Sequence, residues 1–248
     1  MYLVRIGTLM ALLPPPPARV LDLGCGTGWT SLFFARAGYE VVGADIAPDM
    51  IRLANELRDR EGLANASFVV SDYEALTFHN EFDAVVFFHS LHHADDEGLA
   101  LRKAFAALKP GGVLLADEPG VGHAASENSL EAVAKFGVTE KDLPPAHLVE
   151  LGRAAGFEAF RVFPCAESLA KVVYTGRAEP LPDPFADTGP AAERLHRTGL
   201  RRTCDRVLSR LRPTPAWRLT NVDHLLLHIH ADGLVLMRKG AHSARAAA

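Results

Sequence analysis

Apolar runs alternate with stretches of helical periodicity over the first half of the chain. The runs are short and end at glycine or at polar residues, which is typical of strands in a parallel sheet covered on both faces. They lie at residues 20–23, 40–44, 68–70, 84–88 and 113–116. The stretches between them predict helices at residues 29–37, from Pro48 onward and at 95–108. This alternation predicts an α/β fold with a doubly wound, mostly parallel sheet.

The second half of the chain is less regular. We expect helices at residues 130–136 and 144–155, a strand at 157–163, a proline-rich loop at 178–190, a helix at 191–211 and a hairpin formed by 225–230 and 234–238. From this pattern we predict a core at residues 1–164, a helical insertion or cap at 165–223, strands at 224–240 that complete the core sheet, and a frayed tail at 241–248.

Composition and charge exclude several classes of protein. Apolar residues make up 48% and charged residues 23%, as in soluble globular proteins. The formal net charge of −4 argues against a nucleic-acid-binding protein. No apolar run is long enough to span a bilayer, and a signal peptide ending near residue 13 would be cleaved against the first strand. The three widely spaced cysteines favour a reducing, cytoplasmic setting without disulfides.

A glycine-rich loop follows the first predicted strand directly. Gly24, Gly26 and Gly28 allow a sharp turn and a close approach of a ligand to the backbone. A dinucleotide fingerprint would place its third glycine at position 29, where this chain has Trp29. Acids follow the next two strands: Asp45 could accept hydrogen bonds from ribose hydroxyls, and Asp72 could accept one from an adenine amino group.

The segments VLDLGCGTG, GADIAPDMI, SDYEAL, FDAVVFFHSLHH and LKPGGVLLADEP occur in this order between Arg19 and about Glu118. Together they resemble class I S-adenosylmethionine-dependent methyltransferases, and in particular the small-molecule enzymes with a DxGxGxG first motif. The resemblance implies a seven-stranded, Rossmann-like sheet, S-adenosyl-L-methionine as cofactor and methyl transfer as the activity. It says little about the methyl acceptor.

The resemblance also implies a role for each residue of these segments. The methionine part of the cofactor would face the loop backbone, with the side chain of Asp22 orienting it, and Asp45 would hold the ribose. Ile46 would pack on the adenine, Asp72 would bind its amino group near the Tyr73 backbone, and the residues after the fourth strand would flank the sulfonium. The implied cofactor-binding residues are Asp22, Gly24, Cys25, Gly26, Asp45, Ile46, Asp72, Tyr73, Phe88, His89 and Ser90.

Methyl transfer to a hydroxyl or a carbon acid also needs a base, and histidine suits neutral pH. The candidates, in order of preference, are His93, His92 and His123, which follow the fourth and fifth strands. The alternative is that these side chains only cap a helix or bond a backbone carbonyl. Glu118 is as compatible with a structural role as with a catalytic one.

A metal site is the less favoured interpretation of the histidines. His89, His92 and His93 with Asp95 and Asp96 have ligand chemistry, as do His224, His228 and His230. Packed or solvated histidines explain both groups more simply, and we therefore predict no metal.

The acceptor is expected to be a small molecule. The chain lacks an NPPY-type motif after the fourth strand, which counts against methylation of amino groups on nucleic-acid bases or glutamine, so we favour O-methylation of a sugar or other metabolite, with C-methylation open. Seven arginines in residues 191–212 suggest an acidic or phosphorylated acceptor, or simply a solvated helix face. An inactive methyltransferase-fold binding partner and a nicotinamide-dependent oxidoreductase remain alternatives.

Overall fold

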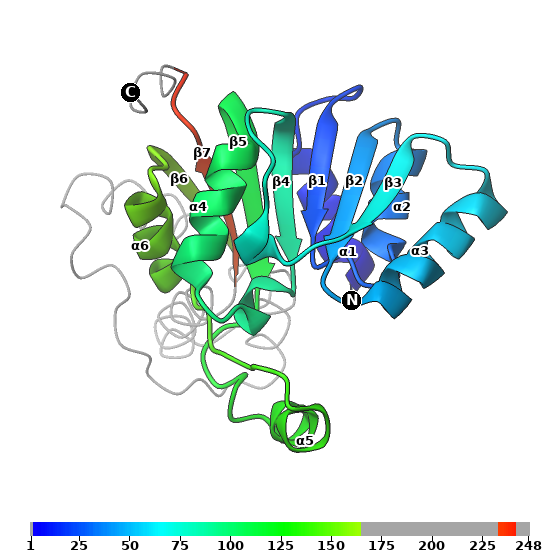
Figure 1. The fold of residues 1–248 in the computed structure, drawn as a ribbon. Helices are drawn as coiled ribbons and strands as arrows, with labels where there is room; N and C mark the ends of the chain where they lie inside the picture. Colours follow the sequence, from blue (N-terminus) through cyan, green and yellow to red (C-terminus); the bar gives the residue numbers. More distant parts are fainter. Residues whose placement is uncertain (1, 165–232, 242–248) are drawn as a thin grey trace, which may run out of the picture.

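A computed structural model describes residues 2–164 and 233–241. The predicted cap at 165–223, its arginine-rich helix, the strand at 225–230 and nearly all of the tail lie outside the described residues. The described residues form a sheet with helices packed on both of its faces (Figure 1).

The sheet has seven strands in the order β3-β2-β1-β4-β5-β7-β6. Their bounds are β1 (Arg19–Leu23), β2 (Glu40–Asp45), β3 (Ala66–Val70), β4 (Phe82–Phe88), β5 (Leu108–Glu118), β6 (Ala159–Pro164) and β7 (Gly233–Arg238). The first five strands are parallel to their neighbours, and β7 runs antiparallel between β5 and β6. The predicted doubly wound, seven-stranded sheet is therefore confirmed.

The described residues form six helices, and all of them except α5 bury apolar residues against one face of the sheet. The helices are α1 (Tyr2–Leu12), α2 (Trp29–Arg36), α3 (Pro48–Glu61), α4 (Glu97–Ala107), α5 (Glu127–Phe136) and α6 (Pro145–Ala155), with short 3₁₀ turns η1 (Tyr73–Ala75) and η2 (Leu91–His93). Leu21 and Leu23 point into the core under α4 and α6, whereas Val20 points into the core under α1, α2 and α3. This alternation along β1 explains why apolar residues point to both faces of the sheet, with the buried Asp22 as the polar exception.

The structure corrects the sequence interpretation at two places. The helix α1 was not predicted, although Ile6, Leu9 and Leu13 follow a helical spacing and are buried in the core. The strand β5 begins at Leu108 rather than at residue 113, because Leu108 pairs with Phe82 and the register shifts before Ala84. The chain therefore stays extended through the proline and glycines that were expected only to end the helix.

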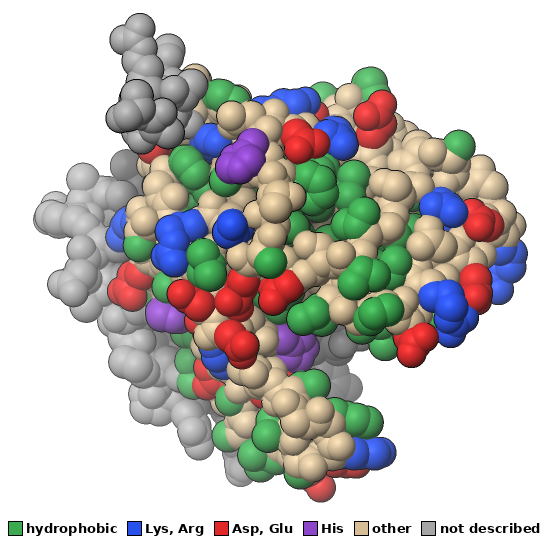
Figure 2. Space-filling model, in the orientation of Figure 1, with side chains coloured by type: hydrophobic (Ala, Val, Ile, Leu, Met, Phe, Trp, Pro, Cys, Tyr) green, Lys and Arg blue, Asp and Glu red, His purple; other side chains and the backbone are tan. Residues whose placement is uncertain are grey.

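The carboxyl ends of the strands meet at one edge of the sheet, and α5 lies beyond that edge (Figure 1). Its two flanking loops leave and return together, since the Leu143 N–H donates to the Pro119 carbonyl at 2.9 Å. We call residues 119–143 the α5 arm. Figure 2 shows a hollow between this arm and the sheet domain, with a histidine side chain on its wall. Among the described residues, no helix is both long and apolar enough to cross a membrane.

Candidate functional site

The glycine loop lies at the reversal of strand order, between β1 and β4, where α/β folds bind ligands. Gly24 and Gly26 both adopt left-handed backbone conformations, with φ of 71° and 54°. A Cβ at Gly24 would collide with the side chain of Ser90, so this glycine serves packing. A Cβ at Gly26 would meet no atom within 4 Å. Gly26 is thus the member of the loop that faces open space.

The N–H groups of this loop are bonded to the end of β2. Gly24 and Cys25 both donate to the Ala44 carbonyl, at 2.8 and 3.0 Å, and Gly26 donates to Oδ2 of Asp45 at 2.8 Å. A ligand would therefore meet loop carbonyls and the Cα of Gly26 rather than unpaired amides. Burial also raises the pKa of the Cys25 thiol, so this side chain stays protonated at neutral pH.

Asp22 lies under the loop and is 1% exposed. Its Oδ2 accepts hydrogen bonds from the hydroxyls of Thr30 and Ser31, at 2.5 and 2.6 Å, at the start of α2. Burial raises the pKa of Asp22, and the two hydroxyls counteract that rise only in part. The side chain thus ties β1 to the helix behind the loop and fixes the shape of the turn between them.

The two acids after β2 and β3 shape the turns at the same edge. Asp45 bridges two backbone amides, because its Oδ1 accepts from Ala47 N–H at 2.9 Å while its Oδ2 holds Gly26. Asp72 caps η1 by accepting from Glu74 N–H at 2.8 Å. Beside Asp45, the Ile46 side chain is 66% exposed although it is apolar. An exposed apolar side chain flanked by acids is suited to packing on a polar-edged ring.

The residues after β4 are held tightly. Ser90 donates its hydroxyl to the Leu23 carbonyl at 2.7 Å, and the Tyr73 hydroxyl donates to the Ser90 carbonyl at 3.1 Å. Phe88 is 8% exposed, and its ring meets the edge of Trp29. Trp29, which the sequence analysis treated only as the residue in place of a third fingerprint glycine, therefore packs against the β4 end at the loop.

His89 has a left-handed backbone, with φ of 52°, which is uncommon for a side chain of this size. Its Nε2 lies 2.8 Å from Nη1 of Arg5, and the same guanidinium nitrogen lies 2.9 Å from Asp117. Burial lowers the pKa of His89 to about 4, and the nearby Arg5 acts in the same direction, against the opposing effect of Glu118. His89 is therefore neutral at pH 7, and its Nε2 accepts from Arg5.

The three candidate bases come together with two glutamates, a group that we call the histidine cluster. It consists of His92, His93, Glu118, His123 and Glu140. The rings of His92 and His93 have centroids 3.9 Å apart, and the His92 and His123 centroids are 5.0 Å apart. Thus residues from η2, from the end of β5 and from the α5 arm meet at one place.

Glu118 is fully buried and organises the cluster from below. It accepts hydrogen bonds from the backbone N–H groups of Ser90 and Leu91, at 3.1 and 2.9 Å. Its Oε2 lies 2.7 Å from Nδ1 of His92. Burial alone would raise the pKa of Glu118, but these hydrogen bonds, His92 foremost, hold that pKa below its usual value. The carboxylate thus stays charged and fixes a proton on Nδ1 of His92.

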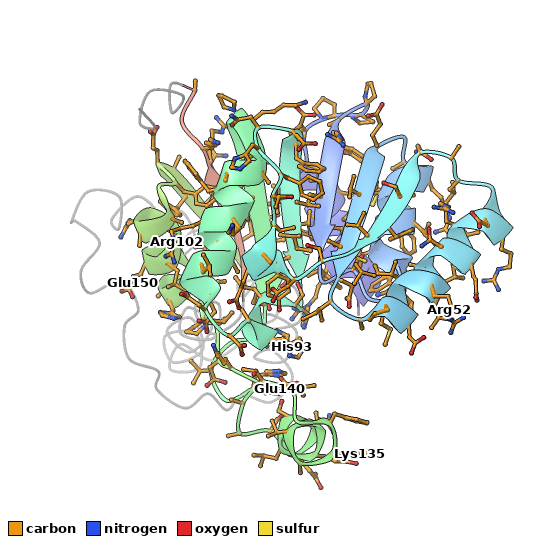
Figure 3. The ribbon with its side chains drawn as sticks, viewed as in Figure 1. Arg52, His93, Arg102, Lys135, Glu140 and Glu150 are labelled. Carbon is orange, nitrogen blue, oxygen red and sulfur yellow. The ribbon has the colours of Figure 1, made fainter. Side chains whose placement is uncertain are left out.

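Glu140 reaches the cluster from the α5 arm, where Figure 3 labels it close to His93. One of its oxygens lies 2.7 Å from Nε2 of His123 and 3.6 Å from Nε2 of His92. Its other oxygen lies 3.8 Å from Nδ1 of His93. The Nδ1 of His93 itself bonds the Thr139 carbonyl at 2.7 Å, as the alternative to a catalytic role had anticipated.

The methyltransferase domain family matches residues 20–112, which contain the glycine loop, the strand-end acids and η2. This part of the chain is a class I S-adenosylmethionine-dependent methyltransferase domain. The suspected resemblance is therefore confirmed at the level of the family.

The domain has curated relatives that act on different atoms. It is 37% identical over 113 residues to a "ubiquinone biosynthesis O-methyltransferase" of Xanthomonas axonopodis, covering 45% of this chain and 47% of that protein. It is 43% identical over 102 residues to a "ubiquinone/menaquinone biosynthesis C-methyltransferase" of Serratia proteamaculans, covering 39% and 41%. The chain thus matches about half the length of these relatives.

The fold extends further than the sequence match. The structure of phosphoethanolamine N-methyltransferase 2 from Haemonchus contortus, in complex with S-adenosyl-L-methionine, aligns with a TM-score of 0.61 and 20% identity. The alignment covers 96% of this chain and 52% of that one. At this identity the likeness concerns the fold of the methyltransferase domain alone.

The sequence analysis did not single out Arg5 and Glu140, which the structure brings to the candidate site. Arg5 is an isolated charge in an otherwise apolar helix, which is a signal that it is paired or functional. Glu140 stands in a polar stretch with no periodicity and gives no comparable signal. Conversely, Asp95 and Asp96 stay apart from the histidines: their N–H groups bind Glu74, and the Asp96 side chain caps α4.

Proposed function

We propose that the whole protein is an S-adenosylmethionine-dependent methyltransferase that methylates a hydroxyl group of a small molecule. One observation carries this proposal: an open glycine, a bridging acid and an exposed apolar side chain lie together at the reversal of strand order. These are Gly26, Asp45 and Ile46. The family of residues 20–112 supports the same activity.

The described residues fit the cofactor in a simple way. The carboxylate of Asp45 would accept from the ribose hydroxyls, Ile46 would cover the adenine ring, and Asp72 would accept from its amino group. The methionine part would pass over Gly26 toward Phe88, His89 and Ser90, with Asp22 fixing the turn that supports it. The cofactor, when bound, supplies a methyl group that is already activated by its positive sulfur.

The chain has to align the acceptor and remove its proton. The histidine cluster stands at the same carboxyl edge as the glycine loop, where η2 meets the α5 arm, and Figure 3 labels His93 and Glu140 there. A buried Glu118 on Nδ1 of His92 fixes one tautomer and leaves the other ring nitrogen as a proton acceptor. We therefore propose that an acceptor hydroxyl loses its proton to this cluster, with His92, His93 and His123 as the candidate bases.

The nature of the acceptor is proposed only as a class. The curated relatives include an O- and a C-methyltransferase of quinone biosynthesis, which supports a small-molecule acceptor and gives no particular support to a sugar. An acidic or phosphorylated acceptor remains a prediction, since it rests on the arginines of residues 191–212. A cytoplasmic location is proposed on the cysteine content alone.

Calorimetric titration with S-adenosylhomocysteine tests the cofactor site. Asp45→Asn should weaken binding about tenfold or more, because hydrogen bonds to a charged group contribute about 1.5–3 kcal/mol. Asp49→Asn is the matched control, since this side chain is exposed on the first turn of α3, and its binding should stay unchanged. Equal affinities of wild type and Asp45→Asn would refute the assignment of Asp45 to the ribose.

Two further results would replace the proposal. Displacement of S-adenosylhomocysteine by micromolar NADH or NADPH would favour the oxidoreductase. Tight cofactor binding without methyl transfer to any of a panel of phenolic, sugar and phosphorylated acceptors would favour the inactive binding partner.

A further inference from the structure

The histidine cluster has an arrangement that proton transfer alone does not require. His92, His93 and Glu140 each offer one ligating atom, and these three atoms all lie within 4.8 Å of one another. Around a tetrahedral ion with bonds of about 2.0–2.1 Å, ligand atoms stand roughly 3.3–3.4 Å apart. Oε2 of Glu140 lies 3.6 Å from His92 and Oε1 lies 3.8 Å from His93, so both separations are a few tenths of an ångström longer than that spacing, and the carboxylate has to turn to ligate through one oxygen.

The separation between His92 and Glu140 is too long for a hydrogen bond. The two groups nevertheless face each other, with side chains that are 5% and 9% exposed. His92 is held in this orientation from behind, because Glu118 accepts the proton of its Nδ1 at 2.7 Å. Its Nε2 therefore presents a lone pair toward Glu140. A carboxylate behind a histidine is the usual support of a histidine that ligates a metal.

The charges of the histidine cluster also favour a bound cation. Glu118 and Glu140 place two carboxylates in one cluster, the first fully buried and the second with a side chain that is 9% exposed. Within the described part of the chain, their ionic partners are histidines and not lysine or arginine. Lys141 is turned to Glu97 and to backbone carbonyls, and Asp142 caps the turn at Gly122. Carboxylates with so little access to water need a compensating charge, which protonated histidines or a bound cation can supply.

We propose that His92, His93 and Glu140 bind a divalent transition-metal ion of the zinc class. Imidazole nitrogens with one carboxylate suit such an ion, and three protein ligands leave a coordination position open. His123 stays hydrogen-bonded to Glu140 outside the ligand set. To bind the ion, His93 exchanges its bond to the Thr139 carbonyl for the metal.

The binding of the ion does not rest on the proposed methyl transfer, whereas its role does. In that role the acceptor's hydroxyl oxygen would bind at the open coordination position, and the ion would lower the pKa of this hydroxyl. The proton leaves to His123, and the oxygen then takes the methyl group while the sulfonium becomes a neutral thioether.

The test is metal binding to the full chain after removal of any affinity tag and of bound metal with a chelator. Zn²⁺ titration calorimetry should give stoichiometric binding, and Co²⁺ should produce the visible absorption of a four-coordinate site. Glu140→Gln and His93→Ala should each weaken binding tenfold or more. His93 is 40% exposed on its side chain, so this second variant leaves the core intact. Glu118→Gln, behind the ligands, should weaken binding about 10–100-fold.

His147→Ala is the matched control. His147 also stands 3.8 Å from a glutamate, Glu150, but on the exposed surface of α6. Its removal should leave the affinity for Zn²⁺ unchanged. Absence of stoichiometric binding in the wild type, or wild-type affinity in both Glu140→Gln and His93→Ala, would overturn the metal site. Metal binding that persists while S-adenosylhomocysteine fails to bind would instead overturn the proposed function and leave the metal site standing.

Discussion

A substitution at Gly26 can distinguish an effect on folding from an effect on cofactor binding, because the backbone conformation of this glycine and its role toward the cofactor can be tested separately. The residue has a left-handed backbone, with φ of 54°, and a Cβ there would meet no neighbouring atom. We expect Gly26→Ala to fold and to lose cofactor affinity. Gly62→Ala is the matched control, since Gly62 ends α3 with φ of 67° and equally empty surroundings.

The magnitudes follow from these two environments. A left-handed alanine costs roughly 1–2 kcal/mol, so both variants should lose about that much unfolding free energy. At Gly26 the added methyl also occupies space beside Asp45, to which this glycine donates at 2.8 Å. Crowding of a bound ligand by one methyl costs about 1–3 kcal/mol, which is roughly a 5- to 150-fold loss of affinity.

The assay pairs urea unfolding with calorimetric titration of S-adenosylhomocysteine. Gly62→Ala should bind like the wild type, and Gly26→Ala should bind more weakly at a similar loss of stability. If both variants bind like the wild type, Gly26 does not face the cofactor and the interpretation of the loop is wrong. If Gly26→Ala and Gly62→Ala lose affinity for S-adenosylhomocysteine equally, the loss follows from lower stability, and a specific contact between Gly26 and the cofactor is refuted.

Two further expectations concern stability. Because burial lowers the pKa of His89 to about 4 while the unfolded side chain titrates near 6.5, the unfolded chain binds the proton first, and stability falls as pH drops from about 6.5 toward 4. Between pH 7.5 and 5 the free energy of unfolding, measured with urea, should fall by about 2 kcal/mol. This fall should be smaller in His89→Asn, because asparagine tolerates the left-handed backbone and does not titrate. An unchanged pH dependence in that variant would contradict the lowered pKa of His89. Leu9→Ala should cost about 2–5 kcal/mol in the same assay, because Leu9 is fully buried under the sheet; a loss well under 1 kcal/mol would mean that α1 does not pack there.

The sheet could be predicted because its strands are buried on both faces. In β4, every residue from Ala84 to Phe87 is fully buried, and no polar residue interrupts the strand after Asp83. The helix α1 was missed for the opposite reason. Its apolar residues fit both a signal peptide and an amphipathic helix, and only the helical spacing of Ile6, Leu9 and Leu13 distinguishes the helix.

The place of the two strand-end acids in the fold was predictable, whereas their role toward the cofactor stays a prediction. Asp45 is the last residue of β2 and Asp72 follows β3 by two residues, and parallel strands bring their carboxyl ends to one edge of the sheet. Glu140 obeys no such rule. It reaches the histidines because residues 119 and 143 meet through a backbone hydrogen bond, which folds the arm back on the sheet edge. The contacts of such a long loop depend on the course of its backbone, which the pattern of apolar and polar residues does not determine.

The two halves of the site are therefore held by different forces. The proposed cofactor half consists of turns that are continuous with the buried sheet. The α5 arm is joined to the rest of the domain by polar contacts such as Lys141 to Glu97 and Nδ1 of His93 to the Thr139 carbonyl, and Glu140 to His123 and Asp142 to Gly122 close the arm on itself. Partly exposed polar contacts of this kind contribute little each, so the arm should open at a lower free energy than the sheet. A cation shared by His92, His93 and Glu140 would join η2 directly to the arm. In that case the ion would do more than activate an oxygen, because it would also fix the wall of the hollow against which the acceptor has to be aligned.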